Sequence, residues 1–243
     1  MRVELQAIEV ERQGATILAG VDLTCEPGTL TVVLGHSGAG LTTLLKTAAG
    51  LIAPTRGRVL LDGQPLDTLD QRARQALQTR TGFAFQDAAL WANTNLLGNF
   101  SLPLRAKYPD LDAEAQQRLI HATLNSWGFA ADLNLRPAML SQGQRKVASF
   151  LRALIPGPEA IFLDEPLASL DRRWRQQVRR TMDELREAGV TVLAAGHHAE
   201  LAGSLADQLV VLDQGRVLAV GPTEAVTGAD DPRVRAILGD DGD

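Results

Sequence analysis

Short apolar runs alternate with amphipathic stretches along most of this chain. The run at residues 30–34 is rich in β-branched side chains, ends in a glycine-rich stretch, and is followed at once by an apolar helical pattern at 44–49. That order predicts a strand, a loop and a helix. Similar patterns predict strands at 3–10, 15–24, 58–61, 160–163, 190–194 and 208–212, and an amphipathic helix at 172–188. Such alternation indicates a mostly parallel sheet with helices packed against it.

The strand signal fades between about residues 94 and 139. The segment 112–127 contains helix-forming residues, and Asp112 stands before them in an N-cap position. We therefore expect a helical insertion in an α/β chain, folded as one domain with two lobes. Disorder is expected only at residues 239–243.

Composition and charge narrow the classes of function. Apolar residues make up 45% and charged residues 22%, as in globular proteins with a sizeable core. A formal net charge of −5 offers no basic surface for a phosphate backbone, so we expect no nucleic-acid partner. We find neither an export signal nor an apolar run of about eighteen residues in this sequence. We therefore expect the chain neither to be exported nor to span a membrane by itself. The single cysteine, Cys25, fits the cytoplasm, although a small buried side chain explains it as well.

The glycine-rich stretch has the spacing of a phosphate-binding loop. Its glycines allow the backbone to wrap around phosphate oxygens, and its N–H groups and the following helix N-terminus supply positive potential. Thr42 offers a hydroxyl to Mg²⁺, and Thr43 offers one near the α-phosphate. The residues expected to contact nucleotide in this loop are Gly35, His36, Ser37, Gly38, Ala39, Gly40, Leu41, Thr42 and Thr43.

Leu41 stands where this pattern has lysine. The lysine ammonium lies between the β- and γ-phosphates, so its loss is expected to lower both affinity and rate. Lys46 is a poor substitute, because it begins about 7.5 Å further along the predicted helix and on another face.

Two carboxylates, Asp164 and Glu165, end the apolar strand predicted at 160–163. In a phosphate-loop protein, the first holds Mg²⁺ and the second polarises the attacking water. Most acid pairs at strand ends are only capping or surface residues. The segment Leu140–Gln144, a short distance upstream, favours the functional interpretation.

Several ordered motifs resemble those of the ABC ATPases. Leu140-Ser-Gln-Gly-Gln144 is similar to the ABC signature LSGGQ, and Ser169-Leu-Asp171 is similar to the D-loop. Gln86 matches the Q-loop, and His197 matches the switch histidine. The resemblance implies a P-loop NTPase fold of the ABC type, with an antiparallel β portion, a core lobe at 1–86 and 156–243, and a helical lobe at 87–155.

The resemblance also implies roles for individual residues. ATP and Mg²⁺ are the implied cofactors. The implied catalytic residues are Glu165, His197 and Gln86, and the implied metal ligands are Thr42, Gln86 and Asp164. The residues implied to contact nucleotide outside the phosphate loop are Arg12, Ser141, Gly143, Gln144 and Asp171.

This sequence departs from the family pattern in several places. Gln142 replaces the first signature glycine, which puts bulk where backbone approaches the γ-phosphate held by a partner subunit. No aromatic residue precedes Phe83 to stack on adenine, and Arg12, near the matching position, offers only a guanidinium plane. Because His197 and His198 are adjacent, the match to the switch histidine is uncertain by one position. The alignment of Gly196-His197 with the family pattern favours His197.

Two further segments, 88–105 and 231–238, resemble the ATPase of the Mla-type, MCE-associated systems that move phospholipid between bacterial membranes. Alternatively, these two segments are generic ABC sequence in the coupling region and indicate no particular subgroup. The resemblance implies a second ATPase subunit, identical or different, with each ATP between two subunits. It also implies permease subunits docking near the Q-loop, and a peripheral position on the inner face of the cell membrane.

Three classes of function remain open. The first is a transport ATPase of reduced activity, favoured by the retained acid pair. The second is a non-hydrolysing subunit that completes a partner's site or regulates a permease, favoured by Leu41, Gln142 and the absent aromatic. A soluble ABC protein of repair or translation is the third, but such proteins generally carry tandem ATPase domains.

An apolar and aromatic cluster surrounds Gln86. Most of its members are expected to be core residues, but Trp91 stands in a loop-like stretch where the family receives a helix of its permease. An exposed tryptophan there is expected to anchor that interface. The cluster consists of Phe83, Phe85, Leu90, Trp91, Leu96, Leu97 and Phe100.

Overall fold

A six-stranded sheet forms the centre of the computed structural model, which describes residues 1–201 and 206–239. The strand order is β10-β9-β3-β8-β7-β6, and every neighbouring pair is parallel except β9 with β10. The inner strands are continuous apolar runs because both faces of the sheet are covered. Its strands are β3 (Leu30–Leu34), β6 (Thr81–Ala84), β7 (Ala160–Asp164), β8 (Thr191–Gly196), β9 (Gln208–Asp213) and β10 (Arg216–Pro222).

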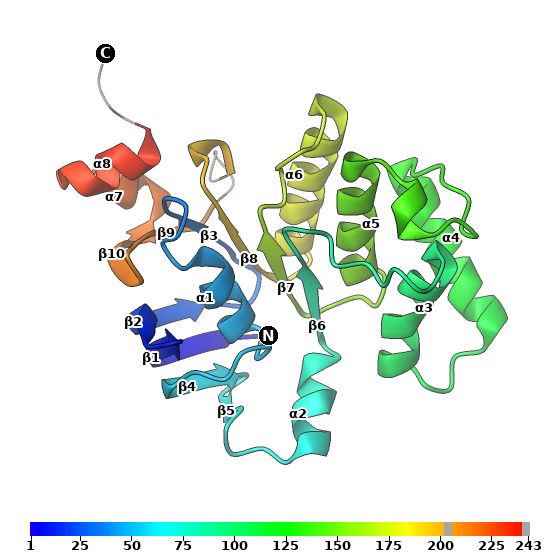
Figure 1. The fold of residues 1–243 in the computed structure, drawn as a ribbon, viewed down its shortest axis with the longest axis horizontal. Coiled ribbons are helices and arrows are strands. Elements are labelled where there is room, and N and C mark those ends of the chain that lie inside the picture. The colour runs from blue at the N-terminus through cyan, green and yellow to red at the C-terminus, as the bar shows by residue number, and fades with distance from the viewer. Residues whose placement is uncertain (202–205, 240–243) are drawn as a thin grey trace.

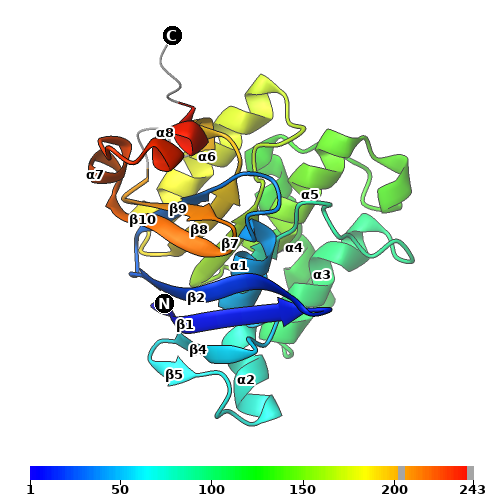
Figure 2. The same ribbon diagram turned by 60° about the vertical axis from the view of Figure 1, so that its left-hand side comes forward.

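A second sheet, antiparallel, lies beside the first, as Figure 2 shows. Its order is β2-β1-β4-β5, and bulges interrupt the pairing of β1 with both neighbours. Bulges bend and twist a strand, which suits a small sheet that curves over a helix. The strands are β1 (Val3–Arg12), β2 (Ala15–Cys25), β4 (Arg56–Leu61) and β5 (Gln64–Pro65).

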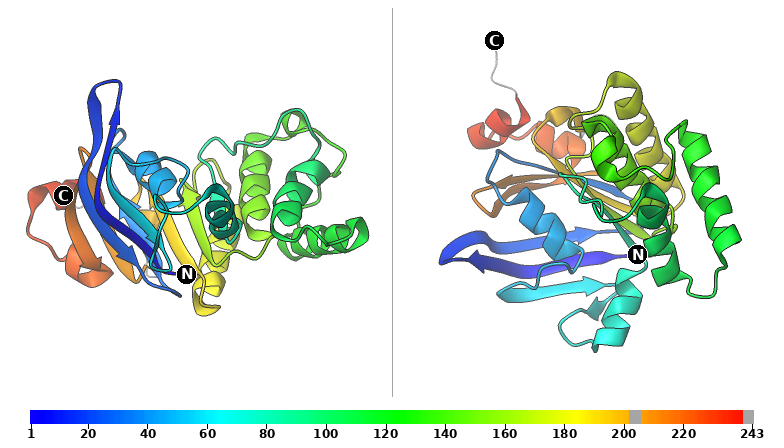
Figure 3. Two further views of the ribbon diagram at one scale, coloured as in Figure 1. Left: turned by 90° about the horizontal axis from the view of Figure 1, so that it is seen from below. Right: turned by 45° about the vertical axis from the view of Figure 1, so that its right-hand side comes forward.

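Helices cover both faces of the central sheet (Figure 1). On one face α1 (Leu41–Ala48) lies between the two sheets, and on the other α6 (Arg172–Glu187) packs against β3 and β8. Three helices, α3 (Leu96–Lys107), α4 (Ala113–Trp127) and α5 (Gln142–Leu154), gather at one end of the molecule (Figure 3). The remaining helices are α2 (Gln71–Gln78), α7 (Thr223–Thr227) and α8 (Pro232–Leu238), with single 3₁₀ turns at Pro137–Met139 and Ala199–Leu201.

Alternate residues of the central strands face two different cores. Val33, Leu193 and Val210 point toward α1 and the second sheet, whereas Val32, Val192 and Val211 point toward α5 and α6. Cys25 lies in the core that includes α1, and burial raises the pKa of its thiol to about 12. The thiol therefore behaves as a small apolar side chain.

The α/β fold with an antiparallel portion is confirmed, and each predicted strand is present with its ends shifted by at most two residues. Asp112 caps α4, accepting a hydrogen bond from the Ala115 N–H. The strands β6 and β10 were not predicted, and α3, which contains Pro103, lies within the predicted helical insertion but was not assigned as a separate helix. The lobe boundaries at residues 87 and 155 stay a proposal, and residues 240–243 of the expected disordered end lie outside the described residues. Within the described part of the chain, no helix is both long and apolar enough to span a membrane.

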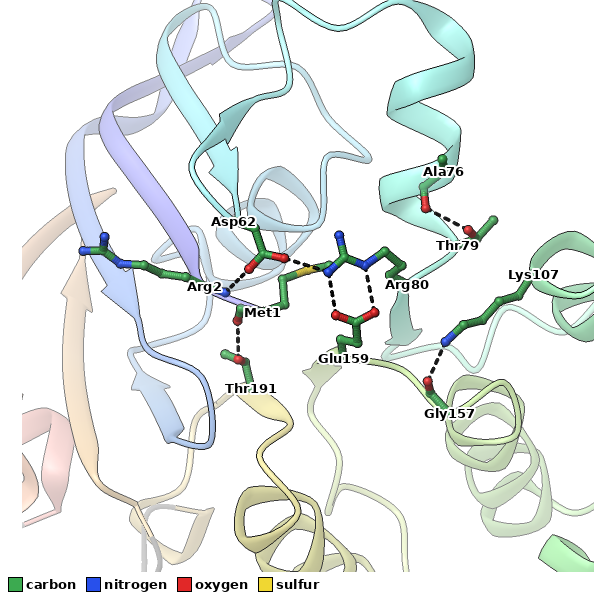
Figure 4. Close-up of polar contacts among 10 residues, drawn as sticks. All are labelled: Met1, Arg2, Asp62, Ala76, Thr79, Arg80, Lys107, Gly157, Glu159 and Thr191. Atoms are coloured by element: carbon green, nitrogen blue, oxygen red, sulfur yellow. Dashed lines mark hydrogen bonds and ion pairs between the residues drawn. The ribbon is translucent and has the colours of Figure 1, made fainter.

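An ionic clamp joins the two sheets near the N-terminus (Figure 4). The guanidinium of Arg80 donates to both oxygens of Glu159, at 2.8 and 2.6 Å, and to Asp62 at 2.7 Å. Asp62 also accepts the Arg2 N–H at 2.8 Å. Because Asp62 follows β4 and Glu159 precedes β7, this bidentate arginine fixes one sheet to the other.

The clamp lowers the pKa of both acids. The Arg80 hydrogen bond holds the pKa of Glu159 below its ordinary value. Burial alone raises the pKa of Asp62, but hydrogen bonds from the Arg2 N–H and from Arg80 outweigh it, so the net shift is downward. A carboxyl with a lowered pKa in the folded state stabilises the fold above its unfolded pKa and loses that effect as the pH falls.

We expect Arg80→Met to lower the midpoint of thermal unfolding by about 3 °C at neutral pH. The difference from the wild type should shrink as the pH falls below about 4, because both carboxyls then become protonated. Thermal melts monitored by circular dichroism across pH 3–8 measure this. Arg118→Met, which removes the exposed pair with Glu114, is the matched control and should have no effect. A difference in the thermal midpoint between Arg80→Met and the wild type that does not change with pH would contradict the stabilising role of the clamp.

Candidate functional site

The phosphate loop consists of residues 35–40, which join β3 to α1, and of the first turn of α1 up to Thr43, and the N-terminus of α1 has no side-chain cap. Gly40, at the N-cap position, has φ 104° and no side chain to satisfy the first helical N–H groups. A Cβ there would lie 2.9 Å from the Ile17 carbonyl oxygen, so the position requires glycine. Helices α2, α4, α5 and α6 are all capped by Asp or Ser side chains. The free N–H groups of α1 therefore suit an anion such as phosphate.

A cavity of about 310 Å³ opens in front of this helix end. Most of the loop lines it, except Gly35 at the end of β3 and the buried Ala39. Ile17 of β2 also reaches it, which sequence reasoning missed because the contact depends on how the two sheets meet. The cavity is lined by Ile17, His36, Ser37, Gly38, Gly40, Leu41, Thr42, Thr43, Gln86, Asp164, Glu165 and His197.

Leu41 occupies the position of the missing cation. Its side chain is 6% exposed and belongs to the apolar core around α1. Among the described residues that line the cavity, the two histidines are the only ones that can carry a positive charge. Lys46 is not among the lining residues, and its ammonium lies 5.9 Å from the ring centroid of Phe85. The described lining of the cavity therefore offers no lysine or arginine to neutralise phosphate.

Asp164 and Glu165 are buried at the carboxyl end of β7, being 2% and 8% exposed. Burial raises the pKa of both carboxyls above their ordinary values, although a hydrogen bond from Thr42 opposes this at Asp164 and His197 opposes it at Glu165. The Thr42 hydroxyl donates to Asp164 Oδ1 at 3.2 Å, and Asp164 Oδ2 has no hydrogen-bond partner in the described structure. An unpartnered carboxylate oxygen beside a hydroxyl fits Mg²⁺, which prefers oxygen ligands.

His197 lies between the phosphate loop and Glu165. Its Nδ1 is 2.7 Å from the Gly35 carbonyl oxygen, and its Nε2 is 3.1 Å from Glu165 Oε1. A carbonyl only accepts, so Nδ1 carries a hydrogen and Nε2 of the neutral ring carries the lone pair. Glu165 Oε1 has no aligned hydrogen bond among the described residues. The close pair is thus favourable only when a proton resides on one partner, which suits a group that accepts a proton from water.

The structure distinguishes the two neighbouring histidines. His197 faces Glu165 and the cavity, whereas His198 lines a separate cavity of about 180 Å³. Of the two, only His197 contacts Glu165 and lines the cavity in front of α1, and its role as the switch histidine stays a prediction.

The signature residues lie away from this cavity, at the N-terminus of α5. Ser141 and Gln144 form a reciprocal capping box, each side chain bonded to the other's backbone N–H. Gln142 is exposed in the first turn. Asp171 caps α6 by accepting the Trp174 N–H at 2.9 Å. None of the signature or D-loop residues lines the cavity, as the family pattern expects for groups that act on a partner's nucleotide.

Arg12 does not reach the cavity either. It is exposed near the tip of the β1–β2 hairpin, opposite Ala15. Its expected place beside adenine stays a prediction.

A second cavity, of about 390 Å³, is lined mainly by apolar residues around Trp91. Trp91 is 49% exposed, and its backbone N–H and carbonyl are both bound by the buried side chain of Asn99. The guanidinium of Arg152 lies 5.2 Å from its ring centroid. Of the expected core cluster around Gln86, only Leu96 and Phe100 are fully buried. The loop thus holds Trp91 in place while leaving its ring available.

Residues 18–168 match the family described as "ABC transporter". The chain is 30% identical to the intermembrane phospholipid transport system ATP-binding protein MlaF of Escherichia coli K12, over 97% of this chain and 88% of MlaF. It is 33% identical to the methionine import ATP-binding protein MetN of Cereibacter sphaeroides, over 94% of this chain but only 65% of MetN. The dimeric ATP-binding cassette MJ0796, solved in a post-hydrolysis state with ADP and Pi, superposes with a TM-score of 0.84 at 26% identity, over 90% of this chain and 98% of MJ0796.

The family match covers more than half of the chain, and the similarity to MlaF extends over nearly all of it. The uncapped helix, the signature helix and the buried acid pair follow one another along the chain in that order. The chain therefore belongs to the ABC transporter family, among its ATP-binding subunits.

Proposed function

We propose that the chain binds ATP with Mg²⁺ in the cavity at α1 and couples slow ATP hydrolysis to transport through a membrane permease. The supporting observation is that Thr42, Asp164, Glu165, Gln86 and His197 line one cavity in front of a free helix N-terminus. Bound Mg²⁺ supplies charge neutralisation of the phosphates. Thr42, Asp164 and Gln86 hold it, while Glu165 with His197 takes a proton from the attacking water.

Leu41 sets the limit of this activity. The backbone N–H groups retain their direction toward phosphate, but no lysine or arginine among the lining residues neutralises the β- and γ-phosphates. The same observation supports the second candidate, a non-hydrolysing subunit that offers Ser141 and Gly143 to a partner's nucleotide. We favour hydrolysis, because a purely passive subunit has no use for two costly buried carboxylates.

The transported molecule is proposed to be a phospholipid or another lipid. The support is that the similarity to MlaF covers 88% of that protein, whereas it covers 65% of MetN and 66% of the Fe(3+) ions import protein FbpC of Pseudomonas fluorescens. Two ATPase subunits, identical or different, are proposed to face each other, and the support is that the similar cassette MJ0796 is dimeric. The chain is then cytoplasmic and peripheral, held at the inner face of the cell membrane by its permease.

The permease is proposed to dock in the apolar cavity around Trp91. Phe83, Phe85 and Pro103 contribute to its walls, and the half-exposed ring of Trp91 stands at its edge. Large aromatics in such positions dominate the energy of protein interfaces. The cavity adjoins the segment that carries Gln86, so docking there connects the permease to the nucleotide site.

Leu41→Lys should raise the affinity of the isolated full-length chain for Mg·ATP by about tenfold to hundredfold, because charge-assisted hydrogen bonds contribute about 1.5–3 kcal/mol. Isothermal titration calorimetry measures both proteins. Leu41→Met conserves volume without adding charge and should leave the affinity unchanged. Micromolar affinity in the wild type, or no gain with lysine, would show that another cation already serves the phosphates.

Trp91→Ala should release the chain from its membrane partner without unfolding it, since Asn99 binds only the Trp91 backbone. Co-purification of permease subunits with a tagged chain measures the first effect, and a thermal midpoint within about 3 °C of the wild type the second. Leu119→Ala, which alters a 44% exposed leucine on α4, is the control and should retain the partner. Persistent co-purification, or a much lower midpoint, would make Trp91 a packing residue.

A further inference from the structure

Lys146 is a buried lysine on α5, the helix that begins with the signature motif. The residue is only 9% exposed, which is rare for lysine unless it is paired. Within the described residues it forms no ion pair with a carboxylate. Its ammonium group instead contacts backbone carbonyl groups of residues at or next to the nucleotide cavity.

Three carbonyl oxygens surround the ammonium nitrogen of Lys146. It donates to Glu165 O at 3.2 Å, to Asp164 O at 3.4 Å and to Phe85 O at 3.5 Å. An ammonium has three N–H donors and no acceptor, so this one atom joins three carbonyls from two strand ends. The carbonyl of Phe85 belongs to the residue directly before Gln86. Lys146 therefore fixes the backbone at Asp164 and next to Gln86. These two residues are the ones outside the phosphate loop that are proposed to hold Mg²⁺.

The backbone at Glu165 is one that needs such support. Its φ of 52° lies in the left-handed region that non-glycine residues seldom adopt. Its N–H donates to the Ala195 carbonyl at 2.9 Å, and its own carbonyl accepts from Lys146. Strained conformations of this kind persist only when surrounding contacts fix them. The contacts of Glu165 with β8 and α5 together aim its carboxylate at His197.

We propose that Lys146 is a positioning residue for the metal-binding part of the nucleotide site. This inference rests on the proposed function. In it, Lys146 keeps Gln86, Asp164 and Glu165 at fixed positions relative to one another. Among the described residues, the Lys146 ammonium has hydrogen bonds to the carbonyls of Phe85, Asp164 and Glu165 and none to the phosphate loop, whose backbone is proposed to bind phosphate independently. Loss of its ammonium should therefore weaken the Mg²⁺-dependent part of ATP binding and leave the Mg²⁺-free part unchanged.

The test uses the full-length chain carrying Leu41→Lys, so that nucleotide binding is strong enough to measure. Calorimetric titrations with ATP are made in Mg²⁺ and in EDTA for this parent and for the same protein with Lys146→Met. The methionine variant should lose about tenfold in Mg·ATP affinity, as for residues that orient metal ligands. Its affinity for ATP in EDTA should change less than twofold. Lys146→Arg, which keeps the charge and donors, should recover most of the loss.

Lys107→Met is the matched control, because Lys107 also donates to a backbone carbonyl, that of Gly157 at 2.6 Å, but far from the site. It should change neither affinity. If the methionine variant does not fold, Lys146→Gln takes its place. It should show the same loss of Mg·ATP affinity and the same unchanged affinity for ATP in EDTA. Equal losses with and without Mg²⁺, or no loss in either, would overturn the positioning role. A parent that binds no nucleotide in either buffer would instead overturn the proposed function, and this inference with it.

Discussion

Two carboxylates buried at the end of β7 constrain the structure around them. Removing Asp164 and Glu165 from water costs several kcal/mol unless neighbouring groups compensate. Partial compensation comes from three directions: the Thr42 hydroxyl donates to Asp164, the His197 ring lies beside Glu165, and the positive charge of Lys146 on α5 opposes the effect of burial on the pKa of both acids. Burial still prevails, so the pKa of both carboxyls stays raised. Two buried oxygens, Asp164 Oδ2 and Glu165 Oε1, have no hydrogen-bond partner among the described residues, and Asp164 Oδ2 suits a metal ion.

In the proposed function, the phosphate loop binds phosphate through backbone N–H groups and the dipole of α1, neither of which depends on residue 41. The acid pair and His197 are proposed to hold the metal and to activate the attacking water. Leu41 lacks the positive charge that a lysine would place between the β- and γ-phosphates. We therefore expect weak nucleotide binding together with retained catalytic chemistry.

Local patterns in the sequence were enough to predict most of the fold. Glycine spacing and a β-branched run predicted the loop at Gly40 and the helix that follows, because these depend on neighbouring residues. The short strand β6 was missed, since four residues that include a glycine carry little strand signal. Pro103 hid α3, because proline normally ends a helix.

The site was only partly predictable for a different reason. Motif spacing pointed to the acids, to Gln86 and to His197 in preference to His198, and the structure brings Gln86, both acids and His197 to one cavity. The contacts of Ile17, Lys146 and Arg152 join residues far apart in the chain, so no local periodicity reports them. Arg12 was placed beside adenine by resemblance alone, and that place stays a prediction.

We propose that this chain's own site still hydrolyses ATP despite Leu41. The most direct measurement is the steady-state release of phosphate by the transporter complex purified from membranes, with the wild-type chain and with Glu165→Gln. We expect slow but measurable, Mg²⁺-dependent turnover in the wild type and a loss of at least about a hundredfold in the variant, as for removal of a catalytic base. Turnover that is absent from the wild type, or unchanged by Glu165→Gln, would contradict this proposal.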